Sequence, residues 1–279
     1  MNSLFKYIKR GIQYVLHEYK QPIINVDVVQ KTPSNLFENK VYLITGGSSG
    51  LGYYIAKKLI EEGAKVIITG RNEVNLKSAK EKLGDRCEYI VYDIREYTKT
   101  DEIINKIIIK NGKLDGIINN AGISLHEWNF LRVDHNGFEN QFLTNLEGSY
   151  FLTQSFIKKY VDQKLKNANI IFISSERGSM CDDLPYGLTK ASINSFVQAL
   201  SYKYYKDGIR VNAVSPGIRA SNMTKIDKES DLFYQNASGR YFIPEEVAEV
   251  VCFLLSDYSK CISGEIIHTN AGNHIKRGY

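Results

Sequence analysis

Cysteine is scarce in this sequence, and its few copies lie far apart. The 279 residues contain four of them, none in a C-x-x-C pair: Cys87, Cys181, Cys252 and Cys261. In a chain of this length, isolated cysteines are typical of reduced thiols in a reducing compartment rather than of a disulfide framework or a zinc cluster. We therefore expect a cytoplasmic protein without a metal site.

Long apolar runs and clusters of like charge are also missing. No run approaches the roughly 18 residues that span a bilayer, and the N-terminus lacks the uninterrupted apolar segment of a secretion signal. Lys and Arg number 36 against 31 Asp and Glu, a net charge of +5 that is spread along the chain. Without a basic stripe interleaved with aromatic residues, nucleic-acid binding is not expected.

Residues 1–38 read as an N-terminal extension with two open interpretations. Leu4, Ile8, Ile12, Val15 and Tyr19 share one helical stripe, and most of the basic residues lie off it. Such a helix packs either on its own domain or subunit partner, or on an anionic membrane surface, which would make residues 1–20 a peripheral membrane contact. A connector with two prolines follows.

Residues 39–279 alternate strand and helix patterns. Short apolar strands are expected at 40–47, 65–71, 87–94, 114–122, 168–175, 209–217 and 265–270. Helices are expected between them at 51–64, 73–84, 99–113, 138–161, 186–204 and 244–257. This alternation predicts an α/β fold, a single doubly wound Rossmann domain with about seven parallel strands and helices on both faces.

The first strand-to-helix turn is rich in glycine. It reads TGGSSGLG, with glycines at the positions that allow a tight turn, close approach to a pyrophosphate and close packing of helix on strand. The phosphates would lie at the helix N-terminus, where backbone N–H groups point outward. Because the turn opens the first βαβ unit, it predicts a dinucleotide site at Gly46, Ser48, Ser49, Gly50, Leu51 and Gly52.

The end of the second strand distinguishes the two nicotinamide cofactors. A carboxylate there binds the ribose 2′-hydroxyl of NAD, whereas an arginine accommodates the 2′-phosphate of NADP. This chain has Gly70 followed by Arg71, which can bind a phosphate through its planar fork. NADP(H) is therefore favoured, and NAD(H) is the alternative. The alternative for Arg71 itself is a solvated loop arginine with no role in cofactor binding.

Two further strand ends carry candidate cofactor contacts. Asp93 would contact the adenine ring and Ile94 would offer a backbone group, although Asp93 also suits a turn or cap. In NNAG, Ala121 and Gly122 leave room for a flat ribose-nicotinamide, and Asn120 can hold either the turn or the sugar.

A tyrosine and a lysine stand four residues apart at the start of the helix expected over 186–204. Tyr186 and Lys190 share a helix face, but that spacing alone occurs in any helix. Upstream, Ser174 and Ser175 end a strand, where alternation turns them to opposite faces, so that only one can reach a shared site.

Together these motifs, with Asn145 in TNLEGSY and the segment SPGIRASNM, resemble the short-chain dehydrogenase/reductase family over residues 40–275. The resemblance implies a catalytic tetrad of Asn145, Ser175, Tyr186 and Lys190. A free phenol, with a pKa near ~10, exchanges a proton poorly at neutral pH, and a nearby ammonium favours the phenolate.

The resemblance also implies the role of each member. Tyr186 gives its proton to the carbonyl oxygen as hydride arrives, Ser175 holds that oxygen, and Lys190 binds the ribose hydroxyls. Asn145 anchors a water that relays protons to Lys190, unless it is only a cap or kink residue.

In the family, the segment that corresponds to residues 215–223 closes on the nicotinamide. Pro216 and Gly217 would shape its turn, the Ile218 backbone would meet the carboxamide, and Ser221 would donate a hydroxyl. The resemblance further implies a homodimer or homotetramer.

We thus expect an NADP(H)-dependent oxidoreductase that interconverts a carbonyl and an alcohol. The charged residues Glu176, Arg177, Asp182, Asp183 and Arg240 suggest a polar substrate, such as a sugar, polyol or nucleotide-linked precursor. A 3-oxoacyl-thioester reductase is the alternative. A non-catalytic nucleotide-binding sensor or assembly subunit is the alternative from another class.

Overall fold

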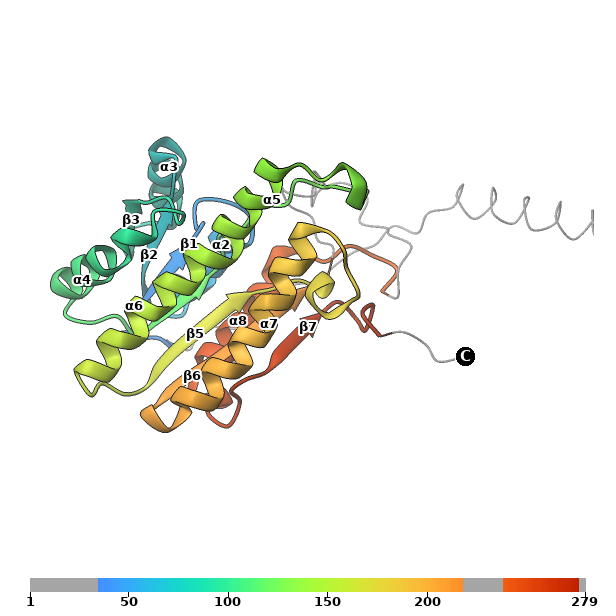
Figure 1. Cartoon of the computed structure of the whole chain (residues 1–279). Helices are drawn as coiled ribbons and strands as arrows, with labels where there is room; N and C mark the ends of the chain where they lie inside the picture. The colour runs from blue at the N-terminus through green and yellow to red at the C-terminus, as the bar shows by residue number, and fades with distance from the viewer. Residues whose placement is uncertain (1–34, 218–237, 276–279) are drawn as a thin grey trace, which may run out of the picture.

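The sheet sets the positions of the carboxyl ends of its strands, and the candidate site lies at these ends. A computed structural model describes residues 35–217 and 238–275. Within them, seven parallel strands form one sheet in the order β3-β2-β1-β4-β5-β6-β7 (Figure 1). The strands are β1 (Val41–Thr45), β2 (Lys65–Gly70), β3 (Cys87–Val91), β4 (Gly116–Asn119), β5 (Ala168–Ile173), β6 (Ile209–Pro216) and β7 (Ile266–Thr269). The order reverses between β1 and β4, and in such sheets a ligand crevice opens at that point.

Helices cover both faces of the sheet (Figure 1). One face carries α2 (Gly50–Glu61), α3 (Glu73–Leu83) and α8 (Pro244–Leu255); the other carries α4 (Thr100–Asn111), α6 (Gly148–Asp162) and α7 (Pro185–Tyr204). The helix α5 (His135–Phe142) leads into α6. Short 3-10 helices are η1 (Tyr97–Lys99), η2 (Phe130–Arg132), η4 (Glu176–Ser179), η5 (Tyr205–Asp207) and η6 (Asp257–Ser259).

The strands are apolar on both faces because both faces are covered. In β1, Tyr42 and Ile44 pack into the core with α2 and α8, whereas Val41 and Leu43 pack into the core with α4 and α6. Phe37 is 1% exposed and packs edge-to-face on Tyr42. The packed domain therefore includes a residue of the predicted 1–38 extension, whose residues 1–34 lie outside the described part.

The predicted doubly wound fold is confirmed, and one helix differs in detail. The helix predicted over 138–161 begins earlier, at His135, because the Asp134 carboxylate caps it by accepting a hydrogen bond from Gly137 N at 2.8 Å. Between α5 and α6 the chain forms a π-helical turn, η3 (Leu143–Glu147). Such turns are frequent at functional sites, and this one carries Asn145.

Candidate functional site

A cavity of about 310 Å³ lies at the carboxyl ends of β1, β2 and β4, where the strand order reverses. Its walls come from the glycine-rich turn, from the residues after β2 and β3, and from the segment after β4. Of the predicted cofactor residues, those that line the cavity are Gly46, Ser48, Ser49, Gly50, Leu51, Arg71, Asp93, Ile94, Asn120, Ala121 and Gly122. The fold thus brings together residues that are up to 76 positions apart in the chain.

The glycine-rich turn is closely packed on one side and open on the other. Gly46 and Gly50 have φ values of +65° and +54°, in the left-handed region that favours glycine. A Cβ on Gly52 would lie 2.5 Å from the Gly46 carbonyl oxygen, so helix and turn touch there. No side chain caps α2, and its first residues line the cavity, so the helix N-terminus is available to an anion. These features fit a dinucleotide pyrophosphate.

Asn120 fastens the turn after β4 to the glycine-rich turn. Its Nδ2 donates to the carbonyl oxygens of Thr45 at 2.9 Å and Gly46 at 3.1 Å. The Thr45 hydroxyl oxygen in turn accepts hydrogen bonds from Asn120 N and Ala121 N, at 3.1 and 3.0 Å. The sequence left two roles open for Asn120, to hold the turn or to bind the sugar. Its amide nitrogen holds the turn.

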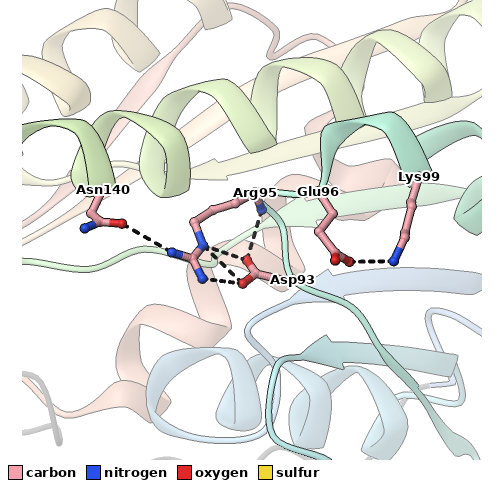
Figure 2. Close-up of polar contacts among 5 residues, drawn as sticks. All are labelled: Asp93, Arg95, Glu96, Lys99 and Asn140. Atoms are coloured by element: carbon pink, nitrogen blue, oxygen red, sulfur yellow. Dashed lines mark hydrogen bonds and ion pairs between the residues drawn. The ribbon is translucent and has the colours of Figure 1, made fainter. Parts of the chain in front are cut away.

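Arg71 and Asp93 lie at one end of the cavity, after β2 and β3. Arg71 is exposed, and its charge contributes to lowering the pKa of Asp93. The larger cause of that low pKa is Arg95, whose Nε and Nη2 donate to the Asp93 carboxylate at 3.1 and 2.6 Å (Figure 2). Arg95 Nη1 also donates to Asn140 Oδ1 on α5 at 3.2 Å. The sequence motifs did not single out Arg95 as a partner of Asp93, although a basic residue two positions after an acidic one can indicate such a pair.

Asn145 anchors the segment after β4 through its side chain. Its Oδ1 accepts from Ile123 N at 2.8 Å, and its Nδ2 donates to Ile123 O at 2.9 Å and to Thr189 Oγ1 at 3.2 Å. Both Nδ2 hydrogens therefore have protein partners. A Cβ on Gly122 would lie 3.3 Å from Asn145 Oδ1 and 3.6 Å from Lys190 Nζ. The π-helical turn, the NNAG segment and the lysine thus meet at one point.

Lys190 is buried beside Tyr186 near the start of α7. Its Nζ donates to the carbonyl oxygen of Ile173, the last residue of β5, at 2.8 Å, and lies 5.7 Å from the centre of the Tyr186 ring. The lysine is 5% exposed, whereas the tyrosine is half-buried. A fixed ammonium within reach of a phenol is an arrangement that can carry proton transfer.

The two serines after β5 point to different surroundings. Ser174 is buried, and its Oγ donates to Asn194 Oδ1 of α7 at 2.6 Å. Ser175 is half-buried and caps η4, its Oγ accepting from Arg177 N at 3.3 Å. Ser174 is therefore engaged by a helix, and Ser175 is the serine that the family resemblance favours.

The charged residues that suggested a polar substrate are largely neutralised by other protein groups. Arg177 forms an ion pair with Asp182, with Nη2 2.6 Å from Oδ1. Arg240 pairs in the same way with Glu246, with Nη2 2.6 Å from Oε1, which lowers the pKa of that carboxyl although burial opposes the shift. Glu176 is buried and hydrogen-bonded to the C-terminal segment. Of the five, Asp183 is exposed, and Arg177, Asp182 and Arg240 are each ion-paired within the protein.

The remaining predicted contacts lie at the end of β6. Pro216 and Gly217 are buried there, and Gly217 N donates to Thr269 O at 3.3 Å. Ile218 and Ser221 lie outside the described residues. Residues 35–217 and 238–275 contain no cluster of three or more metal-binding side chains. The same residues include no helix with both the length and the apolar character to cross a membrane.

Relatives of the chain share most of its length. A family model described as enoyl-(acyl carrier protein) reductase matches residues 46–274. The 3-oxoacyl-[acyl-carrier-protein] reductase FabG of Aquifex aeolicus is 34% identical over 244 residues, which cover 84% of this chain and 97% of that protein. Its namesake from Rickettsia typhi is 36% identical over 241 residues, covering 85% and 97%.

Solved structures also match this chain over most of its length. The 3-ketoacyl-(acyl-carrier-protein) reductase from Brucella melitensis, complexed with NADH, superposes with a TM-score of 0.77 at 28% identity, covering 86% of this chain and 100% of that one. A short-chain type dehydrogenase/reductase from Mycobacterium ulcerans gives a TM-score of 0.79 at 26% identity, covering 87% and 92%.

Proposed function

This chain belongs to the short-chain dehydrogenase/reductase family of NAD(P)-dependent oxidoreductases, and from that premise we propose that it reduces the 3-oxo group of an acyl thioester to a hydroxyl. As a family member it is a carbonyl/alcohol oxidoreductase that binds a nicotinamide cofactor. The observation that carries the proposal is that 3-oxoacyl-[acyl-carrier-protein] reductases match it over 97–99% of their own length. The ion pairs of Arg177 and Arg240 leave less support for a polar substrate.

In the proposed reaction, each group of the tetrad has one task. A bound nicotinamide supplies the hydride to the carbonyl carbon. Tyr186 gives its phenolic proton to the carbonyl oxygen, and Lys190, buried beside it, stabilises the phenolate that is left. Ser175 donates a hydrogen bond to the same oxygen and stabilises its developing charge. Asn145 keeps the Ile123 segment in place against α7.

The substrate is tested by following cofactor oxidation with 3-oxoacyl, enoyl, sugar and polyol substrates. We expect turnover of 3-oxoacyl thioesters, whether the acyl group is carried by coenzyme A or by an acyl carrier protein. Turnover of only sugars or polyols would contradict the proposal. Turnover of only enoyl thioesters would favour the reaction in the family model's description, which reduces a C=C bond instead of a C=O bond.

The proton donor is tested by Tyr186→Phe, which removes only the phenolic oxygen. Loss of a general acid typically lowers kcat by about 10²–10⁴-fold. Tyr202→Phe is the matched control, because Tyr202 lies on the same helix and is 95% exposed. Equal activity of the two variants would remove Tyr186 from the proposed mechanism, whereas a wild type that turns over no carbonyl substrate would favour a non-catalytic nucleotide-binding role.

We further propose that NADP(H) is the preferred cofactor, because Arg71 lines the cavity beside Gly70. A hydrogen bond between charged partners contributes about 1.5–3 kcal/mol, so Arg71→Asp should weaken NADPH binding by about ten- to a hundredfold and NADH binding far less. Lys77→Asp, an exposed change of the same charge on α3, is the control. Equal effects of Arg71→Asp on both cofactors would contradict the preference.

Finally, we propose self-association through an apolar groove between α6 and α7. Its lining includes Leu146, Tyr150, Phe151 and Phe196, and Tyr150 stacks on Phe196 with ring centres 4.7 Å apart. Exposed apolar surface of this kind marks interaction sites. Ala199→Arg should shift the sedimentation of the protein toward the monomer, and an unchanged profile would exclude this face. The membrane contact proposed for residues 1–20 lies outside the described residues.

A further inference from the structure

Glu176 directly follows the proposed catalytic Ser175 in the chain and is not among the residues that line the cavity. It is 6% exposed. Its Oε2 accepts two hydrogen bonds from the C-terminal segment, from Asn270 Nδ2 at 2.9 Å and from Asn273 Nδ2 at 3.0 Å. Both partners are neutral amides, so these two hydrogen bonds involve no ion pair. That is a costly arrangement for a residue whose only task is stability.

The same oxygen lies against the turn that follows β6. A Cβ on Gly217 would be 3.3 Å from Glu176 Oε2. Gly217 is the residue before Ile218, which the family resemblance places at the nicotinamide. One carboxylate therefore joins the serine loop, the C-terminal turn and the start of the segment expected to close on the cofactor.

The opposite side of η4 packs on Lys190. A Cβ on Gly178 would lie 2.7–2.9 Å from Lys190 backbone and Cβ atoms, so the short helix touches α7 at the lysine. Asn194 of α7 holds it further by donating to Gly178 O at 3.1 Å. The short helix is thus fixed between the lysine on one side and the Glu176 hydrogen bonds on the other. Any movement of η4 displaces Ser175 relative to Lys190.

We propose that Glu176 is a positioning residue for the reaction, which holds Ser175 in register with Tyr186 and Lys190 by tying η4 to Asn270 and Asn273. The inference rests on the proposed role of Ser175. Buried hydrogen bonds of this kind restrict the arrangement of the groups they join. Catalytic geometry is sensitive to such fixing, since a displacement of about 1 Å can cost on the order of a hundredfold in rate.

The test is a double-mutant cycle with Ser175→Ala and Glu176→Ala, using any carbonyl substrate that the wild type reduces. Glu176→Ala should lower kcat by about 10- to 100-fold, with cofactor Kd within about threefold of wild type. In the Ser175→Ala background, the same change should cost no more than about threefold further, because both variants remove the same contribution. Asp183→Ala, an exposed acid of the same loop, should leave kcat unchanged.

The conservative variant distinguishes positioning from charge. In Glu176→Gln, the side-chain carbonyl can still accept both amide hydrogen bonds, so kcat should return to within about threefold of wild type. If Gln is as inactive as Ala, the hydrogen-bond argument is wrong. Hydrogen exchange gives a readout without turnover: the Gly178 amide, which donates to Ser175 O at 2.9 Å, should exchange faster in Glu176→Ala than in Glu176→Gln.

The outcomes separate this inference from the proposed function. A wild-type kcat in Ser175→Ala removes the serine from the mechanism and overturns the inference with it. Activity lost in Ser175→Ala but kept in Glu176→Ala, or additive losses in the double variant, overturns the inference alone. If Glu176→Ala does not fold, Asn273→Ala removes one of the two donors; it should lower kcat without adding to Ser175→Ala, and an unchanged kcat overturns the inference.

Discussion

At Gly52, one added methyl group should weaken cofactor binding far more than it destabilises the fold. In Gly52→Ala the new Cβ would lie 2.5 Å from the Gly46 carbonyl oxygen and 2.5 Å from Asn120 Nδ2. The oxygen belongs to the backbone of the turn and cannot rotate away. Ordinary contact begins at 3.4 Å, so the turn must move by almost an ångström. The Asn120 bonds to Thr45 O and Gly46 O are strained by the same movement.

The expected size follows from these contacts. Overpacking typically costs about 1–3 kcal/mol, and the gain in helix propensity from Gly to Ala returns up to about 1 kcal/mol. A net loss of about 1–2 kcal/mol lowers Tm by roughly 2–8 °C in a domain of this size. The turn is also the predicted pyrophosphate site, and a misplacement of about 1 Å there should lower kcat/KM on the order of a hundredfold.

The assay combines thermal unfolding with cofactor titration and initial rates. Gly84→Ala is the matched control, because Gly84 has a φ of +83° with no atom within 4 Å of its added Cβ and does not line the cavity. It should lose about 1–3 kcal/mol of stability from backbone strain and leave cofactor affinity unchanged. Wild-type cofactor affinity in Gly52→Ala would refute the assignment of the turn as the pyrophosphate site.

Three further outcomes are expected. Cys181 and Cys261 are exposed, whereas Cys87 and Cys252 are buried, and burial raises the pKa of the Cys87 thiol to about 11. A thiol reagent should therefore label two cysteines in the native protein and four in denaturant. Rapid labelling of all four cysteines in the native protein would contradict this packing. Arg95 lowers the pKa of Asp93, so the ionised carboxylate stabilises the fold at pH values above its unfolded pKa, and this stabilisation is lost as the pH falls through its folded pKa. Asp93→Asn should therefore lower Tm at neutral pH, and the Tm difference from wild type should shrink below about pH 4. A Tm difference that does not depend on pH would exclude this cause. Arg210→Met removes the buried donor of three hydrogen bonds, to the carbonyl oxygens of Ser256, Ser259 and Ile262, each of which keeps a second donor. At about 0.5–1.5 kcal/mol for each lost bond, Tm should fall by more than about 3 °C with cofactor Kd unchanged, and an unchanged Tm would contradict the contribution of these bonds.

The sequence by itself determined the architecture and supplied the candidates for the reacting groups. Apolar residues recur with the periods of strands and helices, and these local patterns predict a parallel sheet with a crevice at its carboxyl edge. The glycine-rich turn and the helical spacing of Tyr186 and Lys190 are equally local. Strand alternation predicted that only one of Ser174 and Ser175 can reach the site, the family resemblance favoured Ser175, and the structure has Ser174 engaged by α7.

Only the tertiary structure decided what the polar side chains do. Glu176 meets Asn270 and Asn273 across 94 and 97 positions of the chain, and no local pattern encodes such a contact. The pairing of Arg177 with Asp182 and of Arg240 with Glu246 has the same origin, since a charge in the sequence can face solvent, substrate or an opposite charge. The sequence presented these residues as a polar pocket wall. The fold gives four of the five a protein partner, Arg177 and Asp182 with each other, Arg240 with Glu246, and Glu176 with two asparagines, because a buried charge is stable only with partners.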